Sequence, residues 1–302
     1  MKRIGLKSGA LLFLTAFIWG VAFVAQSAAT DFAEPFTFNA IRNLLGGLVL
    51  IPCIYMLDRG KKKHGNRMMP NERRLLVQGG ISCGVILFIA ANLQQIGIEY
   101  TTAGKAGFIT AIYIVLVPLI RIVFKQYAGV QVWIGVLLAA IGLYCLCVTE
   151  NLTFQGSDLY LLVSACCFAG HILVIDYFSP KVDGVKMACI QFFVCGILSA
   201  IFMVLFETPQ LELILTGWFP ILYAGVLSCG VAYTLQIVGQ RDTDPTIASL
   251  ILSLESVISV LAGWVLLGER LNLREGIGCL LMFSAIILTQ LPERKSVDCQ
   301  IE

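Results

Sequence analysis

Long apolar runs separated by short polar segments organise the whole chain. A membrane-spanning helix needs about 20 consecutive, mostly apolar residues, and this chain has ten windows of that kind. Because exposed backbone groups find almost no water in the lipid core, helices are the spanning form available to such runs. No connection is long enough for a soluble domain. The predicted spans cover residues 8–28, 36–57, 75–97, 104–123, 131–149, 157–178, 186–206, 217–239, 246–267 and 275–291.

The two halves of the chain resemble each other at nearly constant offsets. TAFIWG (15–20) matches SACCFA (164–169) and FNAIR (38–42) matches MACIQ (187–191), both at a shift of 149. ANLQQI (91–96) matches AYTLQI (232–237) at 141, and IGVLL (134–138) matches IGCLL (277–281) at 143. An odd number of spans per half inverts the second copy, and inverted repeats are typical of transporters. The predicted units are two five-helix repeats, 1–150 and 151–295, followed by a cytoplasmic tail, 296–302.

A polar stripe closes the third predicted span, in the stretch FIAANLQQIGIEY (88–100). Asn92, Gln95 and Glu99 are spaced i, i+3, i+7, so they share one face of a helix. The shift of 141 carries this stripe onto another polar set, Tyr233, Gln236 and Gln240. We hypothesise that the two stripes line opposite mouths of one central cavity. The alternative is that both are helix ends that reach the membrane interface.

Composition and charge agree with a membrane protein. The chain is 58% hydrophobic and 13% charged, with a mean hydropathy of +0.86, whereas soluble domains are about 45–50% apolar and about 25% charged. The net charge of +2 is too small to indicate a nucleic-acid partner. The basic, then apolar, N-terminus resembles a signal peptide. Its apolar run is followed by similar runs to the end of the chain, so we interpret it as an uncleaved first span.

The distribution of Lys and Arg predicts the orientation. With a cytoplasmic N-terminus, 17 of the 21 basic residues fall in inside segments, three fall outside, and Arg42 lies within a span. The positive-inside bias predicts such an asymmetry. Both termini are therefore predicted to be cytoplasmic, in a multi-pass protein of the cell inner membrane.

Cysteines do not indicate a metal centre. Ten of the eleven lie inside apolar runs, where Cys behaves as a small hydrophobe. Cys145-x-Cys147 and the Cys166-Cys167 pair lack a second pair or a His at zinc-site spacing. We predict no metal, no cofactor and no catalytic residues.

Ionisable residues inside the predicted spans are candidate functional sites, because they are costly in a membrane. Arg42 shares a helix face with Asn39, and it either attracts an anionic or carboxylate-bearing solute or serves as an internal structural partner. Glu255 lies among serines in LILSLESVISV and either carries a coupling proton or pairs with Arg42. His171 is either a gating residue or a hydrogen-bonded core residue. Aromatic cavity walls are predicted from Trp19, Phe23, Tyr113 and Tyr233, and a helix kink is predicted at Pro118.

With these features in place, the chain resembles the EamA-type family of the drug/metabolite transporter superfamily. The resemblance rests on AFIWGVAFV (16–24), FTFNAIRNLLGGLVLIP (36–52), ANLQQIGIEYTTAGKAGFITAIYIVLVP (91–118) and LLGERLNLREGIGCLLMFSAIIL (266–288). It implies ten helices in two inverted five-helix repeats around a central cavity, and an inner-membrane permease, often an exporter of amino acids or related metabolites. Ser256 stands where the family often carries a proline.

The predicted function is a secondary transporter, an exporter of a small polar organic solute such as an amino acid, working by alternating access. The expected partners are that solute and the lipid bilayer, with the chain a monomer or homodimer. No nucleotide-binding motif G-x-x-x-x-G-K-[ST] is present in the sequence. The alternatives are a channel or membrane sensor, and an intramembrane enzyme, for which neither H-E-x-x-H nor paired aspartates are found.

Overall fold

The structure is a computed structural model that describes residues 5–62, 70–100, 103–147, 155–267 and 272–290. Every regular element in these residues is helical. The predicted tail at 296–302 lies outside them. In chain order the elements are α1 (Leu6–Ala29), α2 (Pro35–Lys62), α3 (Pro70–Glu99), α4 (Ala103–Ala111), α5 (Tyr113–Val123), α6 (Val130–Cys147), α7 (Asp158–Phe178), α8 (Gly184–Phe206), α9 (Leu211–Thr216), α10 (Trp218–Leu222), the π-helix η1 (Tyr223–Tyr233), α11 (Thr234–Gln240), α12 (Pro245–Leu252), α13 (Leu254–Leu267) and α14 (Leu273–Gln290).

The predicted all-helical membrane class is confirmed, but the count of ten spans is not. Eight helical segments among the described residues are long and apolar enough to cross a membrane. The predicted span 131–149 corresponds to α6, whose apolar stretch Val130–Leu146 is shorter. The predicted span 275–291 corresponds to α14, which is not one of the eight.

The polarity of the molecule is suited to lipid. Large apolar side chains face outward along the helices, as Leu137 at 61% exposed and Val204 at 75% exposed illustrate. Polar side chains lie inside, and Asn39, Gln95 and Gln191 are each 0% exposed. A bilayer solvates the apolar exterior, while the buried polar groups must find partners within the bundle.

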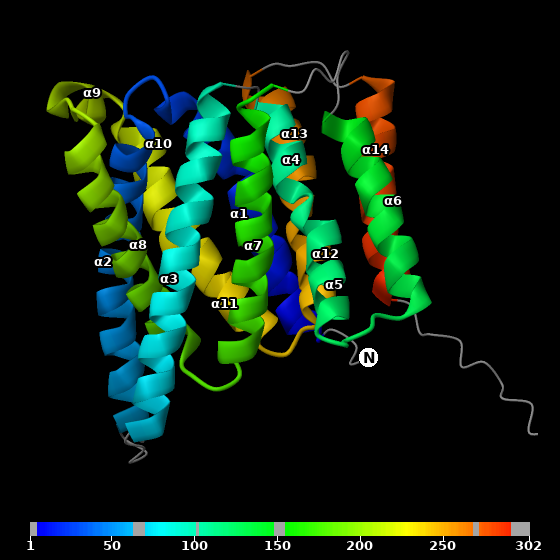
Figure 1. Ribbon diagram of the computed structural model, residues 1–302, viewed down its shortest axis with the longest axis horizontal. Coiled ribbons are helices and arrows are strands. Elements are labelled where there is room, and N and C mark those ends of the chain that lie inside the picture. Colours follow the sequence, from blue (N-terminus) through cyan, green and yellow to red (C-terminus); the bar gives the residue numbers. More distant parts are fainter. Residues whose placement is uncertain (1–4, 63–69, 101–102, 148–154, 268–271, 291–302) are drawn as a thin grey trace, which may run out of the picture.

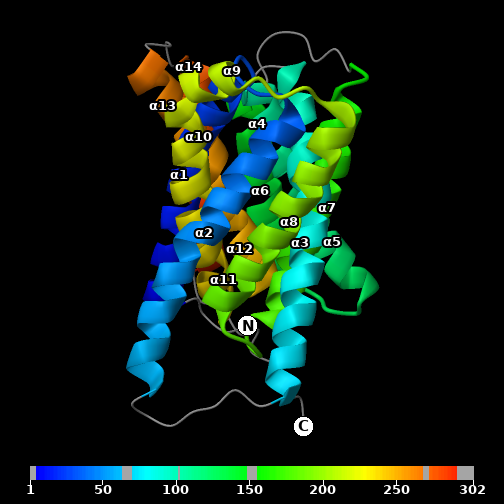
Figure 2. The same ribbon diagram turned by 90° about the vertical axis from the view of Figure 1, so that its left-hand side faces the viewer.

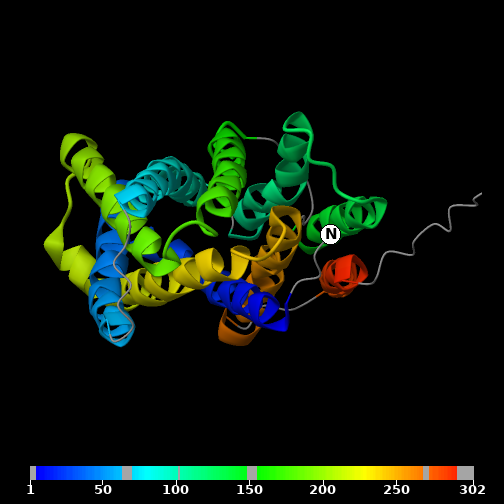
Figure 3. The same cartoon turned by 90° about the horizontal axis from the view of Figure 1, so that it is seen from below.

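The helices run roughly parallel to one another and lie across the longest axis of the molecule (Figures 1 and 2). At one side α2 packs on α8, and α3 packs on both α7 and α8. Near the centre, α1 packs on α13 and η1. At the opposite side α6 and α14 form a pair (Figure 3). Small residues allow these approaches: a Cβ on Gly84 of α3 would lie 2.6 Å from Cβ of Val194 on α8.

Two helical segments are interrupted near their middles. Ile112 separates α4 from α5, and Ser253 separates α12 from α13. The first interruption lies six residues before Pro118, where a kink was predicted, and α5 continues through the proline itself. The second interruption lies where no proline is present, and the Ser253 hydroxyl there donates to the Leu250 carbonyl at 2.7 Å.

Candidate functional site

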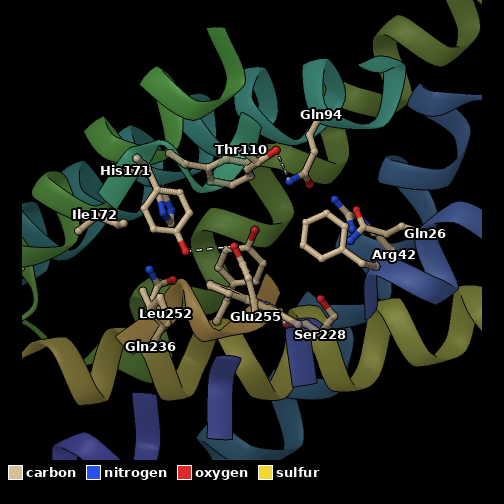
Figure 4. Close-up of a pocket in the computed structure, with 15 residues that line it drawn as sticks. Gln26, Arg42, Gln94, Thr110, His171, Ile172, Ser228, Gln236, Leu252 and Glu255 are labelled. Carbon is tan, nitrogen blue, oxygen red and sulfur yellow. Dashed lines mark hydrogen bonds between the residues drawn. The ribbon is translucent and has the colours of Figure 1, made fainter. Parts of the chain in front are cut away.

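A cavity in the bundle brings together residues from both halves of the chain. It contains about 520 Å³ of space, including the part open to solvent, which is within the range of small-molecule sites. Helices α1 to α5 of the first half and α7, η1, α11, α12 and α13 of the second half all contribute to its wall (Figure 4). The lining residues are Trp19, Phe23, Gln26, Arg42, Gln94, Thr110, Tyr113, Phe168, His171, Ile172, Ser228, Tyr233, Gln236, Leu252 and Glu255.

The two interrupted helices meet in this cavity. Tyr113 is the first residue of α5 and Glu255 is the second of α13, so each follows directly on an interruption. The Tyr113 hydroxyl donates to Glu255 Oε1 at 3.0 Å, and both residues are buried (Figure 4). The described part of the chain gives Glu255 no ion-pair partner, so a neutral hydroxyl is its polar contact.

Arg42 also faces this cavity, from α2. Its Nε donates to Asn39 Oδ1 at 2.7 Å, and its guanidinium carbon lies 5.0 Å from the Phe38 ring centroid. The predicted alternative, an ion pair with Glu255, is absent among the described residues. A buried guanidinium with no carboxylate partner is costly in an apolar environment, so this positive charge is available to a bound anion.

Aromatic rings form much of the remaining wall. The Trp19 and Tyr233 ring centroids are 4.5 Å apart, and Trp19 Nε1 donates to the Ser228 carbonyl at 3.3 Å. The His171 ring lies 6.0 Å from that of Tyr233, and its Nε2 is hydrogen-bonded to Gln191 Oε1 at 3.2 Å. These contacts fix the rings, so the cavity has preformed apolar faces for a solute.

The structure places eight of the predicted site residues on the cavity and five away from it. On the cavity are Trp19, Phe23, Arg42, Tyr113, His171, Tyr233, Gln236 and Glu255. Their binding, coupling and gating roles remain predictions.

The polar stripe of α3 does not line the cavity, in contrast to the hypothesis. Asn92 is turned toward α2 and α8, where it bonds to Asn39 and Ser199. Gln95 Nε2 donates to the Gln26 carbonyl at 3.2 Å, and Glu99 is exposed at the end of the helix.

Asn39 and Gln240 are likewise absent from the cavity wall. Asn39 is fully buried and its amide bonds to α3. Gln240 Nε2 donates to the Ile172 carbonyl at 3.3 Å, at the C-terminal end of α11. Both side chains make contacts between helices, and Gln240 Oε1 has no hydrogen-bond partner among the described residues.

Sequence reasoning missed seven lining residues. Gln94 is the clearest case, because it lies in the polar stretch that predicted its neighbour Gln95. Its Nε2 bonds to Thr110 Oγ1 at 3.4 Å. The remaining missed residues have ordinary compositions for apolar spans and gave no signal: Gln26, Thr110, Phe168, Ile172, Ser228 and Leu252.

The cavity chemistry suits binding of a polar solute. Gln26 Oε1 and Gln236 Oε1 are buried without a hydrogen-bond partner, so they offer acceptors in addition to the charge of Arg42 (Figure 4). Among the described residues, no group of three or more His, Cys, Asp or Glu side chains is placed to hold a metal ion.

Comparison with known proteins identifies relatives along the whole chain. The sequence profile of the EamA-like transporter family matches twice, at residues 7–148 and 155–291. An uncharacterized transporter of Archaeoglobus fulgidus is 32% identical, over 93% of this chain and 84% of its own length. The uncharacterized inner membrane transporter YedA of Escherichia coli K12 is 23% identical, over 93% and 89%. One crystal structure superposes with a TM-score of 0.76 at 18% identity, over 94% of this chain and 97% of the other.

Proposed function

Because the chain belongs to the EamA-like transporter family, we propose that it is a secondary transporter that moves a small polar organic solute by alternating access. The family and the names of its relatives indicate a transporter and not an enzyme. Amino acids and related metabolites are the proposed solutes, and export across the cytoplasmic membrane is the proposed direction. Both termini are proposed to be cytoplasmic, in agreement with the distribution of Lys and Arg.

The buried charge of Arg42 carries the proposal about the solute. Its guanidinium lies on the cavity, and the described residues supply no carboxylate to neutralise it. Guanidinium groups bind carboxylates through charge-assisted hydrogen bonds. Aromatic walls from Trp19 and Tyr233 suit the apolar body of such a molecule. The proposed solute therefore carries a carboxylate.

Contacts between the halves support an inverted repeat of five helices each. A Cβ on Gly47 would lie 3.1 Å from the Phe193 ring, and one on Gly196 would lie 2.9 Å from the Leu44 side chain. The shift of 149 exchanges these two contacts, because it carries Gly47 onto Gly196 and Leu44 onto Phe193. A pair of contacts that map onto each other is expected when two copies pack around a two-fold axis.

The other helices follow the same relation. Gly142 approaches Gly278, and Gly135 approaches Ala285. The shift of 143 carries Gly135 onto Gly278 and Gly142 onto Ala285, so it exchanges these two contacts. The interruptions at Ile112 and Ser253 differ by 141, the offset already found for the polar stripes. Inverted repeats and interrupted helices around one site support alternating access, in which the two halves exchange conformations.

Counterflow tests this function directly. Purified protein is reconstituted into liposomes loaded with unlabelled amino acids, amines, sugars or nucleosides, with labelled tracer outside and no ion gradient. Trans-stimulated entry is expected for carboxylate-bearing solutes, and it should fall at least about tenfold in Arg42→Gln, because the variant loses a charge-assisted contact.

The matched control is Arg59→Gln. Arg59 is exposed and stacks on Tyr55 at 4.4 Å, near the end of α2, so counterflow should not change. Entry without trans-stimulation would favour a channel instead. No entry of any solute into liposomes with folded, inserted protein would contradict the carrier and favour a membrane sensor.

A further inference from the structure

A chain of buried side-chain hydrogen bonds crosses three helices and ends at Arg42. Ser199 Oγ on α8 accepts from Asn92 Nδ2 on α3 at 3.0 Å. Asn92 Oδ1 accepts from Asn39 Nδ2 on α2 at 3.1 Å, and Asn39 Oδ1 accepts from Arg42 Nε at 2.7 Å. All four residues are at most 3% exposed. We call Ser199, Asn92 and Asn39 the amide relay.

The surroundings determine which way each amide of the relay faces. Asn39 Nδ2 is also near the carbonyls of Pro35 and Ala91, at 3.0 and 3.2 Å. Because this nitrogen is surrounded by acceptors, the Asn39 oxygen must be the atom that faces Arg42. Asn92 Nδ2 likewise donates to the Phe88 carbonyl at 2.8 Å, so its oxygen faces Asn39. Every donor in the relay points the same way, an arrangement in which the bonds polarise one another.

The relay supports the guanidinium without neutralising it. An amide oxygen accepts one N–H of Arg42, at Nε, and carries no net charge. The two Nη groups have no hydrogen-bond partner within the described ranges of the chain, and the side chain lies on the cavity. A carboxylate at the position of Asn39 would cancel the charge that a solute needs.

We propose that Asn39 and Asn92 are positioning residues that orient Arg42 toward the cavity and so determine the preference for a carboxylate over an uncharged group. This inference rests on the proposed function, in which Arg42 receives the solute carboxylate. Ser199 connects the relay to α8, so the orientation of Arg42 depends on the packing of α2, α3 and α8. The stripe residue Asn92 thus acts behind the site and not in its wall.

Equilibrium binding to the purified protein in detergent tests the relay. The probes are two acid and amide pairs, benzoate with benzamide and L-phenylalanine with L-phenylalaninamide. In Asn39→Ala the Kd of the acids should rise roughly tenfold, the size expected for a hydrogen bond to a charged group, while the Kd of the amides stays unchanged. Asn43→Ala is the matched control, because Asn43 is equally buried one turn later on α2 and bonds to the Asn39 carbonyl, not to Arg42.

A double-mutant cycle separates positioning from general stability. In an Arg42→Gln background, Asn39→Ala should have no further effect on acid binding, because the residue acts through Arg42. Equal losses in both backgrounds, or an unchanged Kd of the acids in Asn39→Ala alone, would overturn the inference. If Asn39→Ala does not fold, Asn92→Ala and Ser199→Ala are measured in the same cycle, with the same expected and opposing results. If the Kd of the acids is the same in Arg42→Gln as in the wild type, the proposed carboxylate site itself would be overturned, and the relay with it.

Discussion

We propose Glu255 as the residue that couples transport to a proton. Its carboxyl group is buried, bonds to the Tyr113 hydroxyl and lies on the cavity. The other charged or titratable side chains around this cavity are Arg42, His171 and Tyr233. A carboxylate without a cationic partner is costly at this depth, so uptake and release of a proton fit its environment.

We expect Glu255→Gln to abolish the effect of a pH gradient on transport while counterflow persists. Glutamine can still accept the hydrogen bond of Tyr113 through its amide oxygen, but it does not ionise. The measurement is tracer uptake into liposomes with and without a pH gradient. Glu99→Gln is the control, since Glu99 is exposed at the end of α3. A full response to the gradient in Glu255→Gln would rule out this coupling role.

The sequence identified some of the polar residues that line the cavity, but it did not predict which way adjacent polar residues face. Arg42, Glu255 and His171 were identifiable because a polar group in an apolar run is costly and needs a reason. The orientation of Gln94 and Gln95 was not identifiable, because adjacent polar residues on a helix point in different directions. Their rotation is determined by tertiary contacts such as the Gln95 bond to α1.

At the scale of elements, close helix pairs depend on individual glycines. A Cβ on Gly278 of α14 would lie 2.7 Å from the Gly142 carbonyl oxygen and 2.7 Å from the Leu146 nitrogen. Both atoms are backbone, so neither can move without moving α6.

Gly278→Ala is therefore expected to lower the thermal stability of the protein in detergent, at a cost of about 1–3 kcal/mol for overpacking. Gly276→Ala is the matched control on the same helix, because no atom lies within 4 Å of the added Cβ. This control should be neutral or slightly stabilising, since alanine favours helix more than glycine does. Equal melting temperatures for Gly278→Ala and Gly276→Ala would contradict the packing argument.

Helix positions were largely predictable, and helix interruptions were not. Apolar length alone located the long segments, since a bilayer requires it. At Ser253 the hydroxyl bonds to a backbone carbonyl, but Ser249 makes the same kind of bond within the continuous α12, so a serine in that apolar run does not by itself predict an interruption. The π-helix η1 had no signal that we recognised.

At the scale of the whole molecule, an ion pair joins the two interrupted segments at one end of the bundle. Arg121 Nη1 on α5 is 2.6 Å from Asp244 Oδ1, and it also donates to Thr246 Oγ1 at 2.9 Å. Asp244 also caps α12 by accepting from the Thr246 nitrogen at 2.9 Å. This contact joins the C-terminal end of α5 to the N-terminal end of α12, at the ends of these helices away from Tyr113 and Glu255.

We expect Asp244→Asn to open this end, because asparagine preserves the cap but loses the charge. The measurement is the labelling rate of Ser228→Cys by a membrane-impermeant thiol reagent added from that face, with the exposed Cys53 and Cys166 replaced by serine. The rate should rise several-fold. The control is Asp58→Asn, which removes the more exposed pair with Lys186 and should have no effect. Equal rates in Asp244→Asn and the parent would show that the ion pair does not restrict access.

The two halves, which we propose to be inverted copies, differ chemically at matching positions. The shift of 149 carries Arg42 onto Gln191, which bonds to His171. In the proposed alternating-access cycle, exchanging the conformations of the two halves therefore would not exchange the charge. A solute arriving from one side of the membrane meets a different electrostatic environment from one arriving from the other. Half-saturating concentrations should then differ between the two directions. Without an ion gradient, the ratio of the maximal rate to the half-saturating concentration must be the same in both directions, because such a carrier cannot create a gradient. The two directions would then differ in rate only near saturation.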